Sequence, residues 1–328
     1  MNDATQPATE YLPPPPGGLA LAHRGDVDEA TILRADEAAR HWHADTAAPI
    51  YLGTALHKQV TAQMFRDTFN PYKPSIIDWP VLSGDAKARL VSLPIWDIAV
   101  RTEGQARQRM LSYAHSLSDP DWRAAIELNG WEEGRHKTVL SHLVAAYGIV
   151  LEPEPPYPPP RDTEWAYLAT GFSECIDSFF AFGLFELAKR SGFFPEALVD
   201  TFEPVIQEEC RHILLFANWL AWARRNTPWW RRPWFEARVW AVWAMLGWER
   251  IGMARGMDGG KVSAEDTNFT VTSSKHLSDE ELDVWVLMRL CLEENDRRFA
   301  NYDLRLRRPT TMPTLARLAL WVMRKRAK

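Results

Sequence analysis

The sequence is poor in cysteine and has no long apolar run. Its 328 residues include three cysteines, Cys175, Cys210 and Cys291, an odd and sparse set that does not suggest a disulfide framework. Their spacing is not that of a ferredoxin cluster either. Nowhere do eighteen apolar residues follow one another, and the N-terminus has no basic stretch followed by an apolar one. We therefore expect a cytoplasmic protein that does not span a membrane.

An excess of basic charge is also missing. The formal net charge is −5, so no global positive field attracts nucleic acid, and we expect no nucleic-acid partner. The alternation of apolar and polar residues that is typical of strands does not stand out, and the sequence has no glycine-rich dinucleotide-binding loop. The sequence therefore predicts an all-α fold, in a chain long enough to bury a large core.

What the sequence does have is one pattern, Glu-Glu-x-Arg-His, that occurs twice, at residues 132–136 and 208–212. Three residues is just under one helical turn, so the second glutamate and the histidine of each copy point from the same face of a helix. A lone glutamate precedes each copy. Helix-bundle di-iron and di-manganese centres need four carboxylates and two imidazoles in this arrangement. The candidate ligands are Glu103, Glu133, His136, Glu174, Glu209 and His212.

The positions of the turns indicate that these six residues can meet. In an antiparallel helix hairpin, residues equidistant from the turn lie at the same height. The midpoint between the first two carboxylates falls inside residues 116–120, and the midpoint between the second two falls inside residues 191–195. Both segments contain proline, and the second contains glycine, which are the usual stop and start signals of helices. Each half is therefore predicted to be a hairpin with its ligands level at mid-helix.

Six prolines lie between the two halves, within residues 149–162, and predict an extended polyproline segment. At about 3.1 Å per residue such a link reaches roughly 43 Å, which matches the length expected for a helix from about Pro120 to Gly148. The link can therefore run the full height of a bundle. This predicts a long crossover from the second helix to the third, as in ferritin-like bundles.

With these motifs the chain resembles the ferritin-like di-iron carboxylate superfamily, and the form of the motif is most similar to that of soluble acyl-carrier-protein desaturases. The resemblance covers roughly residues 86–225. It implies a four-helix bundle with two iron ions, or manganese, held by the six candidate ligands. It also gives Glu132 and Glu208 the place of acids that orient the histidines, the alternative being a position that faces solvent. Arg135 and Arg211 are expected to pair with carboxylates around the ligands.

Further polar and small residues lie about one turn from the candidate ligands. Thr170 and Asp177, on either side of Glu174, could hydrogen-bond water or a reduced form of oxygen at the metals, the alternative being ordinary polar packing. Glycine in mid-helix costs about 1 kcal/mol relative to alanine. Four glycines near the ligands therefore indicate either space for substrate and dioxygen or close helix contact: Gly104, Gly130, Gly134 and Gly171.

Oxygen and nitrogen ligands suit iron or manganese, and four carboxylates nearly neutralise two such ions. We therefore expect a di-iron oxygenase, hydroxylase or desaturase that activates dioxygen to oxidise a small organic or lipid-like, acyl substrate. The chain has no redox motif that could supply electrons, so an external donor, a ferredoxin or a reductase, is implied. The alternatives are a ferritin-like ferroxidase or storage protein without an organic substrate, a radical-forming subunit that uses a tyrosine such as Tyr167, and a non-enzymatic helical adaptor whose metal-site residues coincide by chance.

Outside the core motifs, the chain is expected to divide into a tail, a bundle and an extension. Residues 1–20 are expected to be a disordered, proline-rich tail. Residues 21–225 should form the bundle with N-terminal flanking helices, and residues 226–328 a helical extension packed on it. A Trp-rich helix from about Trp234 to Met257 should pack on the bundle or on a second subunit of a homodimer. The C-terminal helix from about Thr314 has an apolar face and a basic end, which suits peripheral membrane contact or ordinary docking.

Overall fold

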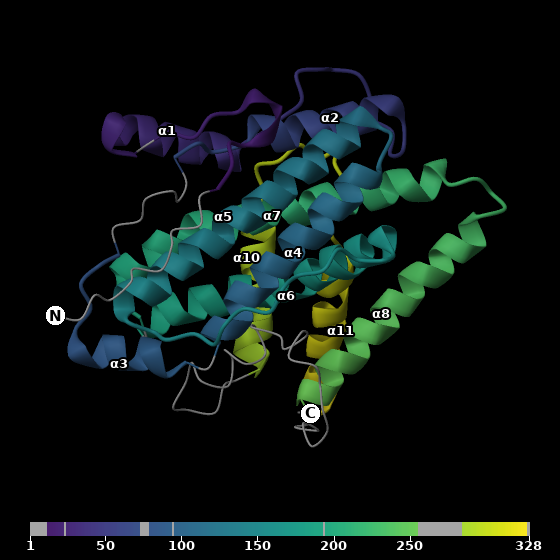
Figure 1. The fold of residues 1–328 in the computed structure, drawn as a ribbon. Helices are drawn as coiled ribbons and strands as arrows, with labels where there is room; N and C mark the ends of the chain where they lie inside the picture. Colours follow the sequence, from purple (N-terminus) through teal and green to yellow (C-terminus); the bar gives the residue numbers. More distant parts are fainter. Residues whose placement is uncertain are drawn as a thin grey trace.

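The structure, a computed structural model, describes residues 12–22, 24–72, 79–93, 95–192, 194–254 and 284–326. Within these ranges the chain forms ten α-helices and no β-strand, so the all-α prediction is confirmed (Figure 1). The helices are α1 (Glu29–Arg40), α2 (Ala55–Asp67), α3 (Gly84–Ser92), α4 (Trp96–Ser116), α5 (Pro120–Tyr147), α6 (Thr163–Ser191), α7 (Glu196–Asn226), α8 (Arg232–Ala254), α10 (Val284–Phe299) and α11 (Thr311–Arg326).

The four long helices α4 to α7 form the centre of the molecule, as two hairpins with the predicted turns. The first turn lies between Ser116 and Pro120, where the Asp119 side chain accepts hydrogen bonds from the first backbone N–H groups of α5. The second follows Gly192, which ends α6 in the left-handed conformation (φ 65°) that favours glycine. Both hairpin predictions are therefore confirmed, and the candidate ligands fall at mid-helix.

Helix α6 is the most enclosed element of the bundle. It contacts α4, α7, α8, α10 and α11. Its side chains Tyr167, Leu168 and Phe182 are fully buried. By length and composition α6 is the one described helix apolar enough to cross a membrane, and its place among five other helices accounts for that composition.

Between α5 and α6 the chain forms no helix. Gly148 ends α5 in the left-handed conformation, and residues 149–162 have no regular secondary structure, as their prolines predict. The Tyr157 ring lies against α4, where a Cβ on Gly104 would be 2.7 Å from it. The ferritin-like form of the crossover stays a prediction.

Helices α1 and α2 lie across the top of the bundle in Figure 1, and α2 contacts α5 and α7. Both were predicted as flanking amphipathic helices, and each begins at a side-chain cap, Asp28 for α1 and Thr54 for α2. Helix α3 was not predicted as a separate helix. It begins at the cap Ser83 and buries Leu90 in a small apolar cluster beside the end of α5.

Residues 12–20 of the expected proline-rich tail have defined places in the structure, while residues 1–11 lie outside the described residues. Residues Pro16–Gly18 form a short 3-10 turn that contacts α5. The Pro13 carbonyl accepts a hydrogen bond from the Trp131 indole N–H (2.7 Å), and the Gly17 carbonyl accepts one from Arg66 (3.1 Å). Proline already restricts the backbone, so ordering this segment costs little entropy and two hydrogen bonds suffice to dock it.

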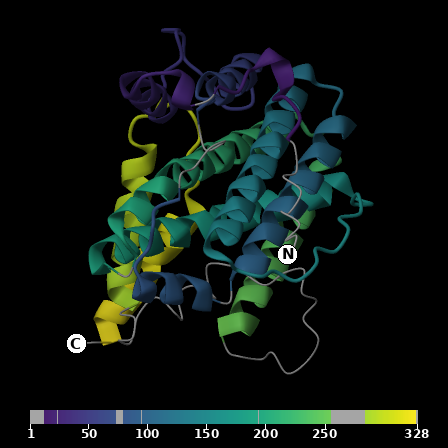
Figure 2. The ribbon, with the colours of Figure 1, turned by 60° about the vertical axis from the view of Figure 1, so that its left-hand side comes forward.

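The described part of the C-terminal extension packs on the bundle through α8, α10 and α11. Helix α10 lies so close to α6 that a Cβ on Gly183 would overlap Cys291. Phe299 and Tyr302 belong to the same apolar core as the bundle helices. Of the extension, residues 255–283, which include the end of the predicted Trp-rich helix, and residues 327–328 lie outside the described residues. Figure 2 shows α8 and α11 as separate elements on different sides of the lower part of the molecule. Membrane contact through α11 stays a prediction.

The spacing of Trp240, Trp243 and Trp248 predicts that they share one packing face of the Trp-rich helix α8, and the helix packs on the bundle by a different face. Trp240 and Trp248 are 72 % and 73 % exposed, and of the predicted face only Trp243 leans on the bundle, with its ring centroid 5.1 Å from that of Phe172. The prediction that the tryptophans as a group pack on this bundle is therefore wrong, because aliphatic and phenyl side chains on the opposite side fill the contact. The buried side chains are Phe235, Val239, Val242 and Leu246.

Candidate metal centre

The two Glu-x-x-His pairs meet in the interior of the bundle. One metal-binding atom from each of Glu133 and His136 on α5 and Glu209 and His212 on α7 lies within 4.8 Å of the others. Glu133 lies against the histidine of the other motif, with its Oε1 2.8 Å from Nδ1 of His212. Glu209 lies between the imidazoles, 3.1 Å from Nδ1 of His136 and 3.8 Å from Nδ1 of His212. Such a cluster can hold a metal ion.

Glu132 and Glu208, the first residues of the two motifs, each accept a hydrogen bond from the histidine of the other motif. Glu208 on α7 accepts a hydrogen bond from Nε2 of His136 (2.9 Å), and Glu132 on α5 accepts one from Nε2 of His212 (3.0 Å). Glu132 and Glu208 are 0 % and 1 % exposed, so the solvent-facing alternative is wrong. Because the carboxylates occupy Nε2, both histidines turn Nδ1 toward the cluster and are more basic ligands there.

Two buried arginines hold these carboxylates in turn. Arg211 donates to Glu132 (2.7 Å) and Arg135 to Glu208, so these pairs also cross between α5 and α7. The arginines are tied to the segment at the end of α2, where Arg211 donates to the Phe65 carbonyl and the Thr68 hydroxyl and Arg135 to the Asn70 carbonyl. The flanking helix α2 is therefore part of the support of the site.

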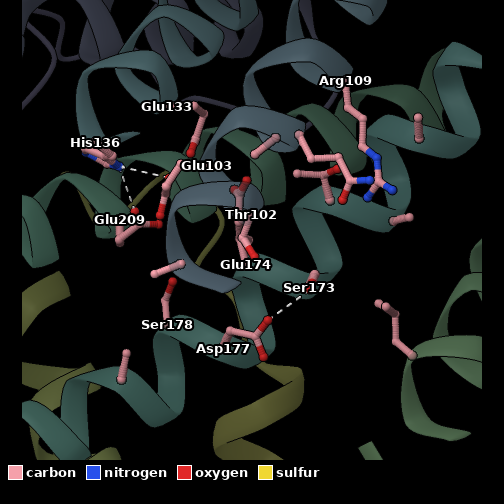
Figure 3. Close-up of a pocket in the computed structure, with 18 of the residues that line it drawn as sticks. Thr102, Glu103, Arg109, Glu133, His136, Ser173, Glu174, Asp177, Ser178 and Glu209 are labelled. Carbon is pink, nitrogen blue, oxygen red and sulfur yellow. Dashed lines mark hydrogen bonds and ion pairs between the residues drawn. The ribbon is translucent and has the colours of Figure 1, made fainter. Parts of the chain in front are cut away.

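Glu103 and Glu174, the glutamates that precede the two motifs, lie beside the cluster on the other two long helices, α4 and α6. Glu103 of α4 has its Oε2 3.7 Å from Nδ1 of His136, and in Figure 3 it points at His136 and Glu209. Glu174 of α6 is buried with neither carboxylate oxygen hydrogen-bonded to any described residue. An orphaned buried carboxylate costs free energy unless a cation or a proton satisfies it. The structure thus brings the six predicted residues to one place.

The pKa shifts of the cluster residues indicate that negative charge exceeds positive charge there. Burial raises the pKa of Glu103 to about 8, and burial followed by the nearby charge of Glu133 raises the pKa of Glu174 well above its usual range. Burial opposes ionisation of Glu133 as well, but the adjacent His212 lowers its pKa to about 2. Burial disfavours charge on the two histidines, yet the surrounding carboxylates raise the pKa of both.

Counting formal charges shows what would neutralise the site. Arg135 and Arg211 offset Glu132 and Glu208, which leaves the four inner carboxylates without fixed counter-charges. Two divalent cations balance four carboxylates, and imidazole Nδ1 atoms complete an oxygen- and nitrogen-donor set that suits iron or manganese. The charges and donor atoms present therefore fit a bound metal cation.

A cavity of about 480 Å³ opens directly on the carboxylate side of the cluster (Figure 3). Five of the six candidate ligands line it, all but His212. The rest of its wall comes from α4 to α8 and residues 160–162. Its apolar part includes Ala106, Ala169, Val205, Ile206, Met245 and Leu246, and charged side chains such as Arg109 and Arg250 line it as well. A second, apolar pocket of about 140 Å³ shares four lining residues with it, Leu140, Ala181, Phe202 and Ile206. The two spaces therefore adjoin.

The two polar residues predicted beside Glu174 differ in their surroundings. Thr170 lines the cavity, and its buried hydroxyl has no hydrogen-bond partner among the described residues. Asp177 accepts hydrogen bonds from Ser173 (3.0 Å) and from Arg250 of α8 (3.0 Å). Thr170 thus keeps the capacity to bond a molecule in the cavity, whereas Asp177 serves to join α6 to α8.

The glycines near the ligands mark close packing, one of the two alternatives. A Cβ on Gly171 would overlap the ring of Phe216, and a Cβ on Gly130 would lie 3.0 Å from Leu111 of α4. The space for a ligand lies instead against the alanines of the cavity wall. The glycines allow the helices to approach closely enough to bring the two motifs together.

Several supporting residues were missed by reasoning from the sequence. Asn129 donates to Oε1 of Glu133 (3.0 Å) and lies one turn before it on α5, so its spacing was a usable signal. Thr68 and Asn70 lie far from both motifs in the sequence, and no local pattern links them to Arg211 and Arg135.

No family model, curated protein or solved structure matches this chain. The residues and their geometry therefore carry the functional argument.

Proposed function

We propose that this chain is a ferritin-like, non-haem di-iron oxidoreductase that uses dioxygen to hydroxylate or desaturate an apolar organic substrate, with manganese as the alternative metal. The ligand set and the double motif support the metal centre. The observation that carries the oxidoreductase part is the cavity of about 480 Å³, because it gives an organic molecule direct access to the carboxylate side of the cluster. The adjoining apolar pocket suits a hydrocarbon portion of that molecule.

Two metal ions bound here would supply reversible one-electron redox chemistry and reduce dioxygen. Glu133, Glu209, Glu103 and Glu174 would hold the ions with carboxylate oxygens, together with Nδ1 of the two histidines. Glu132 and Glu208 keep Nδ1 of both histidines aimed at the ions. The apolar wall excludes water and holds a C–H bond of the substrate near the cluster, and Thr170 offers a hydroxyl that can donate to a polar group there.

The electron balance requires a partner. Dioxygen takes up four electrons on reduction to water, or to one water and one hydroxyl on the substrate. The substrate supplies two electrons when it is hydroxylated or desaturated, so two more must come from outside. The sequence carries no ferredoxin cysteine spacing, and the proposal therefore includes an external electron donor.

The competing function is that of a ferroxidase or iron-storage protein without organic substrate. It accounts for the metal ligands but not for the apolar cavity beside them. The two functions also differ in stoichiometry, since a ferroxidase consumes dioxygen in proportion to the iron added, whereas an oxygenase consumes it in proportion to substrate and reductant.

The decisive experiment loads the purified protein with Fe(II) under anaerobic conditions and measures iron per chain, then dioxygen uptake with a reductant and a ferredoxin–reductase pair. A panel of fatty acids, acyl thioesters and aromatic compounds is included, and products are detected by mass spectrometry. We expect about two iron ions per chain and uptake that continues beyond the iron present when a substrate is added.

Two variants separate the parts of the proposal. Glu133→Ala with Glu209→Ala should lose most of the metal while helix content is retained. Ala106→Phe, which projects into the cavity, should keep the iron but lose most substrate oxidation. Dioxygen uptake that ends once the added iron is oxidised, with every substrate and in both the wild type and Ala106→Phe, would establish the ferroxidase instead.

A further inference from the structure

Helix α8 has two apolar faces, of which the bundle covers one. On the side opposite the buried contact, six apolar residues form a line along the helix that we call the outer stripe. Its three tryptophans, together with Trp240 beside it, are each 64–73 % exposed: Trp230, Trp234, Trp248 and Trp240. The outer stripe consists of Trp230, Trp234, Ala237, Ala241, Ala244 and Trp248, all exposed. Figure 1 places α8 along the outer edge of the molecule.

The outer stripe continues through the turn that leads into α8. The Arg232 N–H donates to the Pro228 carbonyl four residues earlier (3.0 Å), which is the helical pattern. Trp230 therefore lies in register with the stripe, although α8 begins at Arg232. Along the stripe the intervals alternate between four and three residues, the repeat by which one helix packs along another. A lipid surface needs a broad apolar face but no such repeat.

The stripe is also symmetric about its midpoint. Position 239 is equidistant from Trp230 and Trp248, from Trp234 and Ala244, and from Ala237 and Ala241. If two copies of α8 pack antiparallel about this point, each Trp234 ring lies over the small side chain of the partner's Ala244. A large side chain therefore meets a small one where Trp234 faces the partner's Ala244, alanine meets alanine in the centre, and Trp230 faces the partner's Trp248 at each end. A two-fold interface requires this kind of self-complementary surface.

We propose that a second copy of this chain covers the outer stripe, so that the protein is a homodimer formed by antiparallel packing of α8 on the partner's α8. Trp240 lies beside the stripe, one residue from the midpoint, and is placed to stack on the partner's Trp240 at the two-fold axis. The proposal does not depend on the metal centre. It does place the interface on the helix that contributes Met245 and Leu246 to the cavity wall.

The exposed area is of the right order for such an interface. A tryptophan side chain buries about 150–250 Å², so four that are roughly 70 % exposed offer on the order of 550 Å² per chain before the alanines are counted. Stable interfaces bury about 800 Å² per partner. Leaving four tryptophans of one helix in water is otherwise unusual for a monomer.

Two of the arginines near the stripe are paired with acids of the chain itself. Arg238 forms ion pairs with Asp162 (2.7 Å) and Glu164 (3.3 Å), and Arg224 pairs with Glu236 (2.9 Å). These cations are therefore already neutralised within the chain, and the stripe itself contains no charged residue.

The test is sedimentation velocity of the full-length protein at micromolar concentration. The wild type should sediment with twice the 37.6 kDa mass of the chain. Ala237→Glu with Ala241→Glu, and separately Ala237→Lys with Ala241→Lys, should each give the single-chain mass, because like charges then face each other in the centre of the interface. Both sites are exposed helix positions, so helix content should be unchanged. Ala124→Glu, at an exposed alanine of α5, is the matched control and should stay dimeric.

Mixing the two double variants provides the sharper result. The glutamate chain and the lysine chain should form a mixed dimer, because the antiparallel register sets residue 237 opposite the partner's residue 241 at both contacts. A single-chain wild type, a dimer that survives both double substitutions, or variants that fail to recombine would each overturn the proposal. Wild-type binding to phosphatidylcholine–phosphatidylglycerol vesicles that the glutamate variant loses, without dimerisation in solution, would identify the stripe as a membrane surface instead.

Discussion

The crossed bracing of the histidines predicts that a change in one motif weakens the metal site of the other. Glu132 belongs to the first motif on α5, yet its carboxylate accepts the hydrogen bond of His212 and pairs with Arg211, both on α7. Replacing Glu132 with glutamine keeps the shape of the side chain and removes its charge. We expect the His212 imidazole to lose its fixed orientation and the His136 imidazole to keep its own.

The magnitude follows from burial. Glu132 and Arg211 are both 0 % exposed, and the next carboxylate, on Glu208, is 4.0 Å from Arg211. Removing one partner of a buried ion pair costs about 3–5 kcal/mol, and the amide that remains places the expected loss near the lower limit. For a chain of this length that corresponds to a fall in melting temperature of roughly 4 °C. Loss of such a support weakens metal binding by about 10- to 100-fold.

Chelator competition with Fe(II) or Co(II) measures the affinity, and thermal unfolding measures the stability. In Glu132→Gln one of two bound ions should be lost first, and Glu208→Gln should weaken the other. Glu127→Gln is the matched control on the same helix, since Glu127 is 36 % exposed and makes only a 3.8 Å contact with His115. If Glu132→Gln changed metal affinity and melting temperature no more than Glu127→Gln does, the crossed bracing would have no role in the site.

Two further predictions concern packing and pH. Trp243→Ser should lower the unfolding free energy by about 2 kcal/mol, because Trp243 leans on Phe172, whereas Trp229→Ser, at a residue 77 % exposed, should have little effect; denaturant titration of both variants checks this, and equal losses would contradict it. Burial lowers the pKa of His57, which is fully buried and bonded to Asn218 (2.8 Å). As the pH falls below the usual histidine pKa of 6.5, the unfolded chain takes up a proton that the folded chain excludes, so His57 costs stability progressively in that range. The stability difference between the wild type and His57→Gln should therefore shrink from pH 7.5 to pH 5.5, and a constant difference would show that His57 does not titrate on unfolding.

The sequence alone determined which candidate ligands share a helix face and where the turns lie that bring them to one level. Helical periodicity places Glu133 and His136 on one face of a helix, and local backbone chemistry places a turn at Pro120. Both could therefore be predicted from neighbouring residues. The helix-breaking prolines of residues 149–162 belong to the same class. Such features depend on a few adjacent side chains, and the structure confirms them.

The tertiary structure decided which groups these residues face. The pairing of Glu132 with His212 rather than with its own His136, the capture of Arg211 by the end of α2, and the cavity beside Glu174 all depend on how separate helices approach one another. The same holds for α8, whose sequence is apolar on two sides and does not say which side the bundle covers. Packing sums many weak contacts between residues far apart in the chain, and a periodicity that marks a face as apolar carries no information about its neighbour.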